Sequence, residues 1–407
     1  MTTALLPTSS AQRYQALDLI RGVAVLGILI MNIYGFANIF AYYMNPYALG
    51  EPSVSDVWVW SMTHIFADQK FYTLFSMLFG AGIMLMAERA NAQGISAAKY
   101  HYRRMFWLIV FGLIHGLLIW LGDILFIYAC MGLWVFLFTD TSAKTKLITG
   151  IVLIVLYSAY MSMASIYIDR IPAEDLEFMF SMFYPDPATI QEETLPYLTS
   201  YGAQVSDRVD FFKENVLSMG LTFGIFRIGG SMLIGMALYQ YGVLTAARST
   251  KFYWLLLVIG FAIGFLITAY DMSQLLAKEF SFDAMLLSYM TLTNVAAMFI
   301  AIVYIALLAL WVKSSTKGAI RNAFAAVGRM AFTNYIAQSL ICTTIFYSFG
   351  FGLFTELGRL QLMGIVAIVF LVQLFWSSWW LNRFHYGPLE WLWRSLTYGK
   401  FQAFRKH

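Results

Sequence analysis

Long apolar runs alternate with short polar segments along nearly the whole chain. Ten of these runs approach the roughly 20 consecutive apolar residues that an α-helix needs to cross a bilayer. The runs cover residues 19–41, 71–87, 106–121, 124–138, 147–168, 216–241, 252–270, 284–312, 332–349 and 362–381. This pattern predicts an all-α, polytopic membrane bundle of about ten transmembrane helices.

The composition supports a membrane protein and excludes a water-soluble one. Of the 407 residues, 60% are hydrophobic and 12% are charged, whereas soluble proteins carry roughly 25% charged residues. Lys and Arg gather in the segments that share one side of the membrane if the chain crosses it ten times. Because short cytoplasmic loops collect positive charge, we expect both termini in the cytoplasm. The net charge of +4 therefore requires no nucleic-acid partner.

Polar segments divide the chain into parts. Residues 169–215 are acidic and contain four prolines, so we expect a partly ordered cap outside the membrane. The cap separates N-terminal membrane helices, residues 1–168, from C-terminal membrane helices, residues 216–407, which we expect to pack as one bundle. Residues 42–69 are expected to lie along the external membrane surface, because Trp58 and Trp60 favour the headgroup level.

His115 is the most informative polar residue. It lies near the middle of the run 106–121, where an ionisable side chain is costly unless it faces a polar cavity. A neutral imidazole can act as a general base, and a carboxylate such as Asp123 can orient it. Along a regular helix about 12 Å would separate the two residues. Two interpretations stay open, a site residue and a histidine that only bonds a neighbouring helix.

Two further runs carry polar faces. Asp18, Arg21 and Asn32 recur at helical spacing in the first run, and Asn334 and Gln338 lie four residues apart in the run 332–349. Each face either lines a polar passage or joins neighbouring helices by hydrogen bonds.

Charged residues of other runs need partners. Arg227 lies deep in the sixth run and requires a carboxylate, carbonyls, water or an anionic substrate, with Asp68 and Asp123 as candidate carboxylates. Asp68 and Lys70, with His64 upstream, are expected to form an exposed interfacial cluster that could rim an external site. The five histidines are scattered without a Cys/His group, so we expect no metal.

Several stretches resemble known membrane families. LDLIRGVA at residues 17–24, followed by Asn32, resembles the opening helix of the transmembrane acyltransferases that include heparan-α-glucosaminide N-acetyltransferase. The bacterial YeiB family is similar in FYTLFSMLFGAGIMLMAE at 71–88, in the stretch 115–123, in GRMAFTNYIAQSLICT at 328–343 and in GPLEWLWRSLTYGK at 387–400. The YeiB resemblance covers most of the chain, and the acyltransferase resemblance covers its N-terminal quarter.

The acyltransferase resemblance implies a multi-pass enzyme of the bacterial inner membrane, and by analogy a homodimer. Such an enzyme transfers an acyl group from a coenzyme A thioester to a small-molecule, glycan or lipid acceptor. Among acyl groups, we expect acetyl. We expect Asn32 to orient the acyl carbonyl or acceptor, His115 to remove the acceptor proton, and Asp123 and Arg227 to organise the cavity. The remaining expected site residues are Asp68, Asn334 and Gln338 in the cavity, and Arg21, Arg103, Arg104 and Arg329 at the donor phosphates.

One feature of the heparan enzyme is absent from this sequence. That enzyme has a histidine after the asparagine of its first span, whereas residues 42–45 contain none. Either His115 or His64 takes its role, or the chemistry differs.

Two other classes of function share the same spans and intramembrane charges. A transporter or exporter would conduct a solute or lipid through the polar cavity, and paired helix interruptions in two related halves would favour it. We find no such symmetry in the sequence. In a non-catalytic scaffold or lipid receptor, the polar faces would serve helix packing alone.

Overall fold

The computed structural model describes residues 14–216, 219–314 and 318–406, and its regular elements are helices. The first part consists of α1 (Gln15–Ala37), α2 (Phe40–Met44), α3 (Val54–Phe66), α4 (Lys70–Ala92), α5 (Ala97–Ile114), η2 (His115–Ile119), α6 (Leu125–Val135), η3 (Phe136–Phe138) and α7 (Ala143–Ile166). The middle part consists of η4 (Ile168–Arg170), α8 (Ala173–Ser181), α9 (Pro187–Thr199), α10 (Tyr201–Phe211) and η5 (Phe212–Val216). The last part consists of α11 (Met219–Phe223), η6 (Gly224–Gly229), α12 (Gly230–Gln240), α13 (Thr250–Ala277), α14 (Phe282–Leu287), η7 (Ser288–Leu292), α15 (Thr293–Lys313), α16 (Ala319–Arg329), α17 (Ala331–Phe346), α18 (Arg359–Arg383) and α19 (Pro388–Tyr398).

Seven helical segments among the described residues are long and apolar enough to cross a membrane. They are Gln15–Ala37, Val54–Ala92, Ala97–Ile119, Ala143–Met163, Thr250–Ala277, Phe282–Lys313 and Arg359–Arg383. The other three expected crossings fall on shorter or interrupted helices: α6 with η3, α11 through α12, and α17. The all-α membrane bundle is therefore confirmed, while the count of ten crossings stays a prediction.

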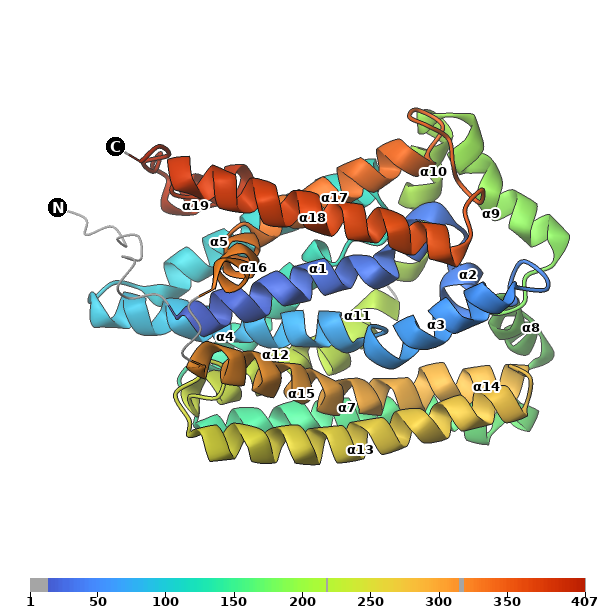
Figure 1. Ribbon diagram of the computed structural model, residues 1–407, viewed down its shortest axis with the longest axis horizontal. Coiled ribbons are helices and arrows are strands. Elements are labelled where there is room, and N and C mark those ends of the chain that lie inside the picture. The colour runs from blue at the N-terminus through green and yellow to red at the C-terminus, as the bar shows by residue number, and fades with distance from the viewer. Residues whose placement is uncertain (1–13, 217–218, 315–317, 407) are drawn as a thin grey trace.

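The long helices run side by side, and the two ends of the bundle differ (Figure 1). The start of α1 and the end of α19 lie at one end together with α16, and α8, α9 and α10 cover the other end. The helix ends on the side of α16 carry Arg89, Lys144, Lys313 and Arg383, and Arg248 lies in the loop just before α13. We name this side the basic end and the opposite side the capped end. If the basic end faces the cytoplasm, the arrangement follows the positive-inside rule.

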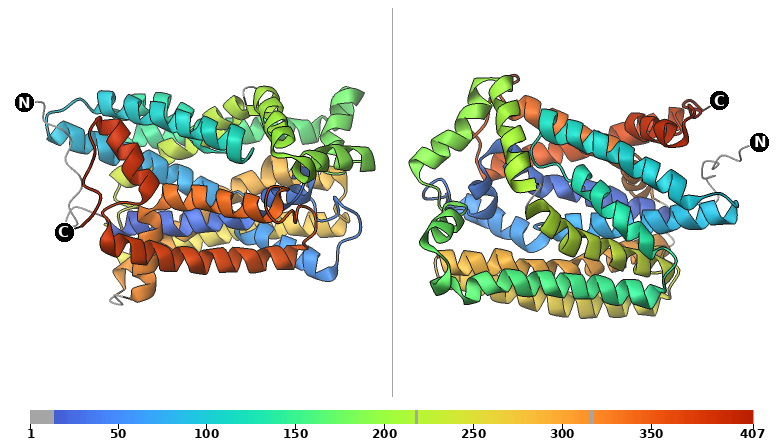
Figure 2. Two further views of the ribbon diagram at one scale, coloured as in Figure 1. Left: turned by 90° about the horizontal axis from the view of Figure 1, so that it is seen from above. Right: turned by 180° about the vertical axis from the view of Figure 1, so that it is seen from behind.

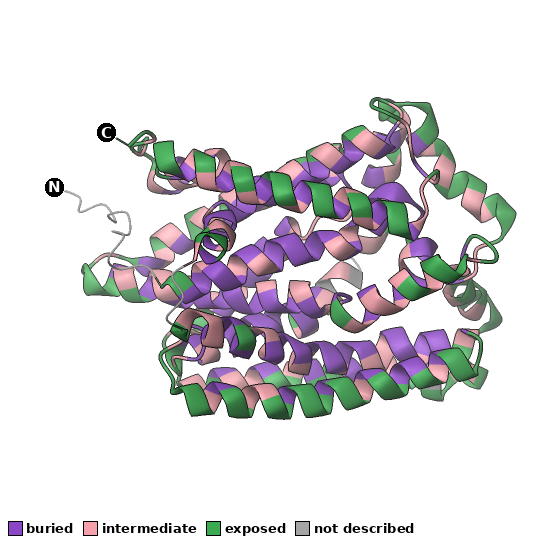
Figure 3. Cartoon of the chain, in the orientation of Figure 1, coloured by how far each residue is buried: buried purple, intermediate pink, exposed green. Residues whose placement is uncertain are grey.

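Two helices form the centre of the bundle. α1 and α4 are largely buried, whereas α13 and α18 present exposed faces at the periphery (Figure 3). Helix α4 packs against α12 at backbone distance, because a Cβ atom on Gly80 would lie 2.0 Å from the carbonyl oxygen of Met232. Gly235 makes the reciprocal approach to Met77 at 1.9 Å. Small residues at such crossings are typical of membrane helix pairs, because they allow close van der Waals contact.

The segment before α4 differs from our expectation. Residues 54–66 form α3, which continues into α4 as one 39-residue membrane-spanning candidate instead of lying along the surface. The two helices meet at Gln69, whose φ of 60° is the left-handed conformation that non-glycine residues rarely adopt. The aromatic pair gave the wrong signal because Trp60 is a core residue, buried against the backbone of Met44, and only Trp58 is exposed.

Candidate functional site

A tight reversal of the chain brings His115 and Asp123 together. Helix α5 changes at His115 into the π-helix η2, which ends at Ile119, and the chain then turns at Trp120 back into α6. Asp123 thereby lies beside Gly116, where an added Cβ would approach the Asp123 Cβ to 3.3 Å. His115 Nδ1 and Asp123 Oδ1 are 2.7 Å apart. The separation expected along a regular helix does not apply, because the turn folds the carboxylate back onto the imidazole.

A serine completes a hydrogen-bonded chain of three side chains. Ser339 Oγ on α17 lies 2.8 Å from His115 Nε2, and the other carboxylate oxygen of Asp123 accepts the backbone N–H of Phe126 at 2.8 Å. All three side chains are almost fully buried. With Asp123 as acceptor, the imidazole proton belongs on Nδ1, which leaves Nε2 to accept the serine proton. This is the functional arrangement of a Ser–His–Asp triad, and we call these residues the triad.

Sequence reasoning missed Ser339. A serine in an apolar helix normally bonds its own backbone, and Ser339 also approaches the carbonyl oxygen of Tyr335 at 3.4 Å. The only signal is the placement of Ser339 one residue beyond Gln338 in a run that already contains polar residues.

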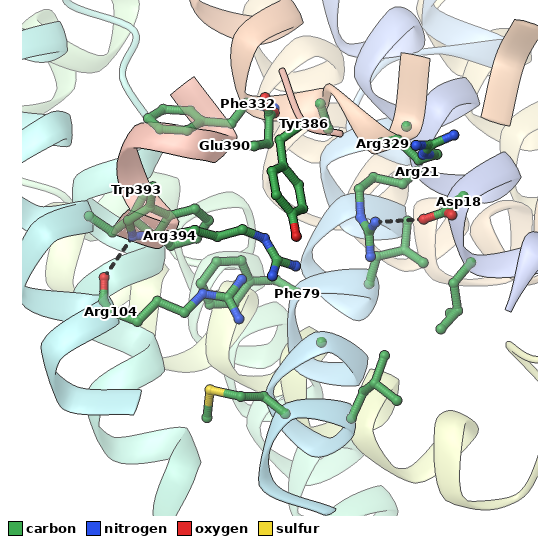
Figure 4. Close-up of a pocket in the computed structure, with 18 of the residues that line it drawn as sticks. Asp18, Arg21, Phe79, Arg104, Arg329, Phe332, Tyr386, Glu390, Trp393 and Arg394 are labelled. Atoms are coloured by element: carbon green, nitrogen blue, oxygen red, sulfur yellow. Dashed lines mark hydrogen bonds and ion pairs between the residues drawn. The ribbon is translucent and has the colours of Figure 1, made fainter. Parts of the chain in front are cut away.

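A cavity of about 310 Å³ opens at the basic end and is rich in arginine (Figure 4). Its cationic wall residues come from five helices and are Arg21, Arg89, Arg104, Arg329 and Arg394. Arg21 pairs with Asp18 at 3.2 Å, and the Arg104 guanidinium lies 4.3 Å from the centre of the Trp393 ring. The clustering of guanidinium groups is suited to phosphate or carboxylate ligands.

The cavity extends toward the triad. Tyr335 and Ile124 both line it, and the Tyr335 ring centre lies 5.2 Å from that of His115. The Tyr335 hydroxyl has no hydrogen-bond partner among the described residues. A single aromatic side chain thus links the cavity wall to the triad.

The two arms of the reversal at Trp120 differ in length. The 11-residue α6 and the three-residue η3 together extend only about 20 Å, whereas the hydrocarbon core is about 30 Å thick. The other arm, α5 with η2, is a 23-residue membrane-spanning candidate that ends in the reversal. Arg208 and Tyr201 of α10 cover it from the capped end, donating to the carbonyl oxygens of Leu117 and Leu118.

An acidic residue also lines the cavity. Glu390 of α19 accepts hydrogen bonds from the backbone N–H groups of Phe332 and Thr333 and from the Thr333 hydroxyl, at 2.7, 3.0 and 2.6 Å. These donors stand at the start of α17, where helix N–H groups lack helical partners. Burial raises the pKa of Glu390 above that of an ordinary glutamate, although the hydrogen bonds oppose the shift.

The four arginines expected at donor phosphates divide into two groups. Arg21, Arg104 and Arg329 line the cavity. Arg103 does not, and its guanidinium lies beside Gly399 at the end of α19. Asn32 is also separate from the expected site, because it contributes neither to the cavity wall nor to the hydrogen bonds of the triad.

Arg227 and Asp68 belong to a second polar region. Arg227, in η6, is fully buried and donates to Asn294 and Thr73 at 3.0 to 3.1 Å, so neither Asp68 nor Asp123 is its ion-pair partner in the described structure. Asp68 instead contacts His64, 3.2 Å away. The expected exposed interfacial cluster is wrong, because His64, Asp68 and Lys70 are at most 1% exposed. The helix α3, which sequence reasoning placed on the surface, is what buries them.

Asn334 and Gln338 join helices together. Asn334 donates to Ser377 at 3.0 Å, and Gln338 donates to Gln373 at 2.9 Å, both on α18. Neither lines the cavity. Their polar face therefore attaches α17 to α18, which holds Ser339 in register with His115. Among the described residues we find no group of His, Cys, Asp and Glu with the geometry of a metal site.

Comparisons with known proteins identify relatives along the full length. A family model described as "Protein of unknown function (DUF418)" matches residues 238–400. The chain is 34% identical to the uncharacterized protein YeiB of Escherichia coli, over 95% of this chain and 96% of that protein. It is 29% identical to the uncharacterized protein YxaH of Bacillus subtilis, over 99% of both chains. By this similarity, the chain with the buried triad and the arginine-lined cavity belongs to the YeiB family.

Proposed function

We propose that this protein is an acyltransferase of the bacterial inner membrane that uses Ser339 as its nucleophile. The observation that carries the proposal is the hydrogen-bonded chain from Asp123 through His115 to Ser339, one aromatic ring away from an arginine-lined cavity. A buried serine is a weak nucleophile until a neighbouring base removes its proton. Here the base is in place, and a carboxylate orients it.

The acyl donor is a coenzyme A thioester. Its phosphates would bind at the basic end among Arg21, Arg104 and Arg329, since guanidinium groups pair with phosphate oxygens through two parallel hydrogen bonds. Its narrow thiol arm would extend along the cavity toward Tyr335. Ser339 is itself only 1% exposed, so the Tyr335 ring must move before the thioester reaches the serine.

The reaction then proceeds in two steps. Ser339 Oγ attacks the thioester carbonyl carbon while its proton passes to His115 Nε2, and this proton leaves with the thiolate as the C–S bond breaks. In the second step, a hydroxyl or amine of the acceptor attacks the serine ester. The acceptor's proton passes to His115 and then to Ser339, which restores the starting state.

The test measures both free thiol release and the acyl-serine. Purified protein is incubated with acetyl coenzyme A, released thiol is followed with a chromogenic disulfide, and acetylation of the Ser339 peptide is measured by mass spectrometry. We expect Ser339→Ala and His115→Ala to abolish both signals. The matched control is Ser231→Ala, because Ser231 is an equally buried serine that donates to the Arg227 carbonyl oxygen one turn earlier and approaches the Met298 sulfur of α15, away from the triad.

The outcomes separate the possible mechanisms. Thiol release that persists in Ser339→Ala but not in His115→Ala would replace the acyl-serine by direct transfer with His115 as base. Release that persists in both variants contradicts the proposal. A co-purified lipid or solute without any thioester would shift the assignment to the transporter alternative.

A further inference from the structure

The second polar region surrounds the break between α3 and α4. Here the membrane-spanning segment is interrupted at Gln69, and two neighbouring spans adopt π-helical turns, η6 and η7, which contain Arg227 and Ser288. In Figure 1, α3 and α4 follow one another along the same direction, with α14 and α15 alongside. Irregular backbone at membrane depth is tolerated where it serves buried polar groups, and π-helical turns are frequent at functional sites.

His64 lies between two carboxylates. Its Nε2 is 2.9 Å from Asp271 Oδ2, and its Nδ1 is 3.2 Å from Asp68 Oδ2. A neutral imidazole carries one N–H, so it can donate to only one of these carboxylates. The 3.2 Å contact lacks hydrogen-bond geometry, so His64 Nδ1 and Asp68 Oδ2 both have no hydrogen-bond partner among the described residues. One added proton, on the imidazole or on the Asp68 carboxyl group, would join these two atoms. We call these three residues the His64 cluster.

Other polar and charged groups lie beside the His64 cluster, while the Trp60 ring stacks on the imidazole at 4.7 Å. Lys70 of α4 donates to the His64 carbonyl oxygen at 2.6 Å, and Arg227 of η6 lies beyond it. Ser288 and Thr293 donate to Asp271 at 3.1 and 3.3 Å. Even so, Asp271 Oδ1 has no hydrogen-bond partner among the described residues. A buried carboxylate oxygen without a donor is costly, which favours a proton-binding role over a purely structural one.

The His64 cluster has a connection toward the capped end. Tyr43 of α2 donates from its hydroxyl to Asp68 Oδ1 at 3.0 Å, and Tyr43 is only partly buried. A phenol can be both a hydrogen-bond donor and an acceptor, so the Tyr43 hydroxyl can pass a proton to the carboxylate from the side of α2.

A row of polar side chains runs from the break at Gln69 toward the cavity. Gln69, Thr73 and Ser76 lie on one face of α4, at spacings of four and three residues. Tyr72 donates to Gln69 Oε1 at 3.1 Å, and Ser76 Oγ is 2.8 Å from the hydroxyl of Tyr128. Tyr128 lines the cavity. We call this face the polar stripe of α4.

We propose that the His64 cluster is a proton-exchange site, and that the polar stripe of α4 connects it to the cavity as a proton pathway across the membrane. The ligand is a proton, which enters at the capped end through Tyr43 and Asp68 and leaves toward Tyr128. A purely structural role does not explain why these charged side chains are buried here, because replacing buried ion pairs with apolar side chains often leaves the stability of the fold unchanged or raises it. The proposal is independent of acyl transfer, because the triad contributes no group to the pathway.

The experiment measures proton flux in vesicles. Full-length protein is reconstituted into liposomes that contain a pH-sensitive dye, potassium and valinomycin. The external pH is then lowered in a single step. We expect acidification of the interior several-fold faster than in protein-free vesicles. His64→Gln and Asp271→Asn should return the rate to that of protein-free vesicles.

Two control variants make the result decisive. His101→Gln removes another buried histidine, which bonds the carbonyl oxygen of Gly132 outside the pathway, and it should retain the flux. Ser339→Ala should also retain the flux while losing acyl transfer, which separates this proposal from the proposed function. If wild-type vesicles acidify no faster than protein-free vesicles, or if His64→Gln matches the wild type, the pathway does not exist.

Discussion

At the scale of single residues, Asp123 determines which nitrogen of His115 carries the proton. Its two carboxylate oxygens are both occupied, one by His115 and one by the backbone N–H of Phe126. An asparagine at position 123 would keep the shape of the aspartate side chain, but its amide group can present an N–H to the imidazole. The histidine would then carry its proton on Nε2, where it cannot accept the serine proton.

We therefore predict that Asp123→Asn folds normally and loses acyl-serine formation. In other Ser–His–Asp enzymes the corresponding change costs about 10⁴-fold in kcat, and we expect a loss on the order of 10³ to 10⁴ here. Rapid-quench measurement of the acyl-serine checks this value. A loss below about tenfold would show that Asp123 does not orient His115 for catalysis.

Gly82 provides a second residue-scale prediction, because it lines the cavity and an added Cβ there would meet no atom within 4 Å. Gly82→Leu should fold, fill part of the cavity and raise the apparent KM for acetyl coenzyme A. Gly364→Leu is the matched control, since Gly364 on α18 has equally open surroundings and does not line the cavity. Equal donor affinity in both variants would place the donor elsewhere.

The residues also show how far the sequence alone can lead. His115 and Asp123 were identified because an ionisable group in an apolar run requires a reason. Ser339 was missed because a buried serine carries no such requirement. Asn32 was expected in the site by resemblance, yet it lies outside the triad and the cavity wall. Chemical type predicts which residues need partners, but only the packed bundle determines which partners they obtain.

At the scale of secondary-structure elements, the contact between α10 and η2 links the cap to the triad. Arg208 is 1% exposed and donates from Nε and Nη2 to the carbonyl oxygens of Leu117 and Leu118. These carbonyls stand at the end of the π-helix that begins with His115. The cap thus contacts the element that begins with His115, the proposed catalytic base.

We predict that Arg208→Ala loosens η2 and lowers both stability and turnover. The Leu117 carbonyl oxygen loses the Arg208 donor, whereas the Leu118 carbonyl oxygen keeps the Tyr201 hydroxyl. Leaving one such carbonyl without its donor costs up to about 3 kcal/mol, which thermal unfolding in detergent should detect. The control is Lys213→Ala, because Lys213 makes only an exposed ion pair with Asp210. Turnover that falls no further than in this control would indicate that the cap does not position His115.

The junction of α17 and α19 predicts a dependence on pH. Because burial raises the pKa of Glu390, the folded protein retains a proton that the unfolded chain releases between the unfolded and the folded pKa. The contribution of Glu390 to stability is then present below the unfolded pKa and is lost as pH rises through the folded pKa. In Glu390→Gln, stability should fall less steeply as pH rises, which thermal unfolding measured from pH 4 to pH 8 will show. An unchanged dependence of stability on pH would contradict the raised pKa of Glu390.

The sequence predicted the fold class correctly, but it predicted the individual helices and their breaks with uneven success. Apolar runs located the spans well, but η2, η6 and η7 leave no trace in a hydrophobic pattern that extends on both sides of them. The break at Gln69 was equally hidden, since a left-handed glutamine has no sequence signature comparable to glycine. These irregular turns carry His115 and Arg227, so the least predictable backbone holds the functional candidates.

At the scale of the whole molecule, the two ends of the bundle must face different compartments. We predict that the basic end is cytoplasmic. In a variant lacking Cys130 and Cys342, a cysteine at Glu192 of the cap should react with a membrane-impermeant maleimide in intact cells. A cysteine at Asn91 should react only after the cells are permeabilised, and both positions are exposed in the structure. The reverse labelling pattern would invert the orientation.

The position of the triad beneath the cap has a consequence for the acceptor. Arg208 and Tyr201 of α10 donate to the carbonyl oxygens of Leu117 and Leu118, in the π-helix that begins with His115. An acyl group delivered from the cytoplasm would therefore complete most of its journey while still attached to its carrier. No full-length tunnel is needed for such vectorial delivery, only a recipient molecule whose reactive hydroxyl or amine reaches beneath the cap.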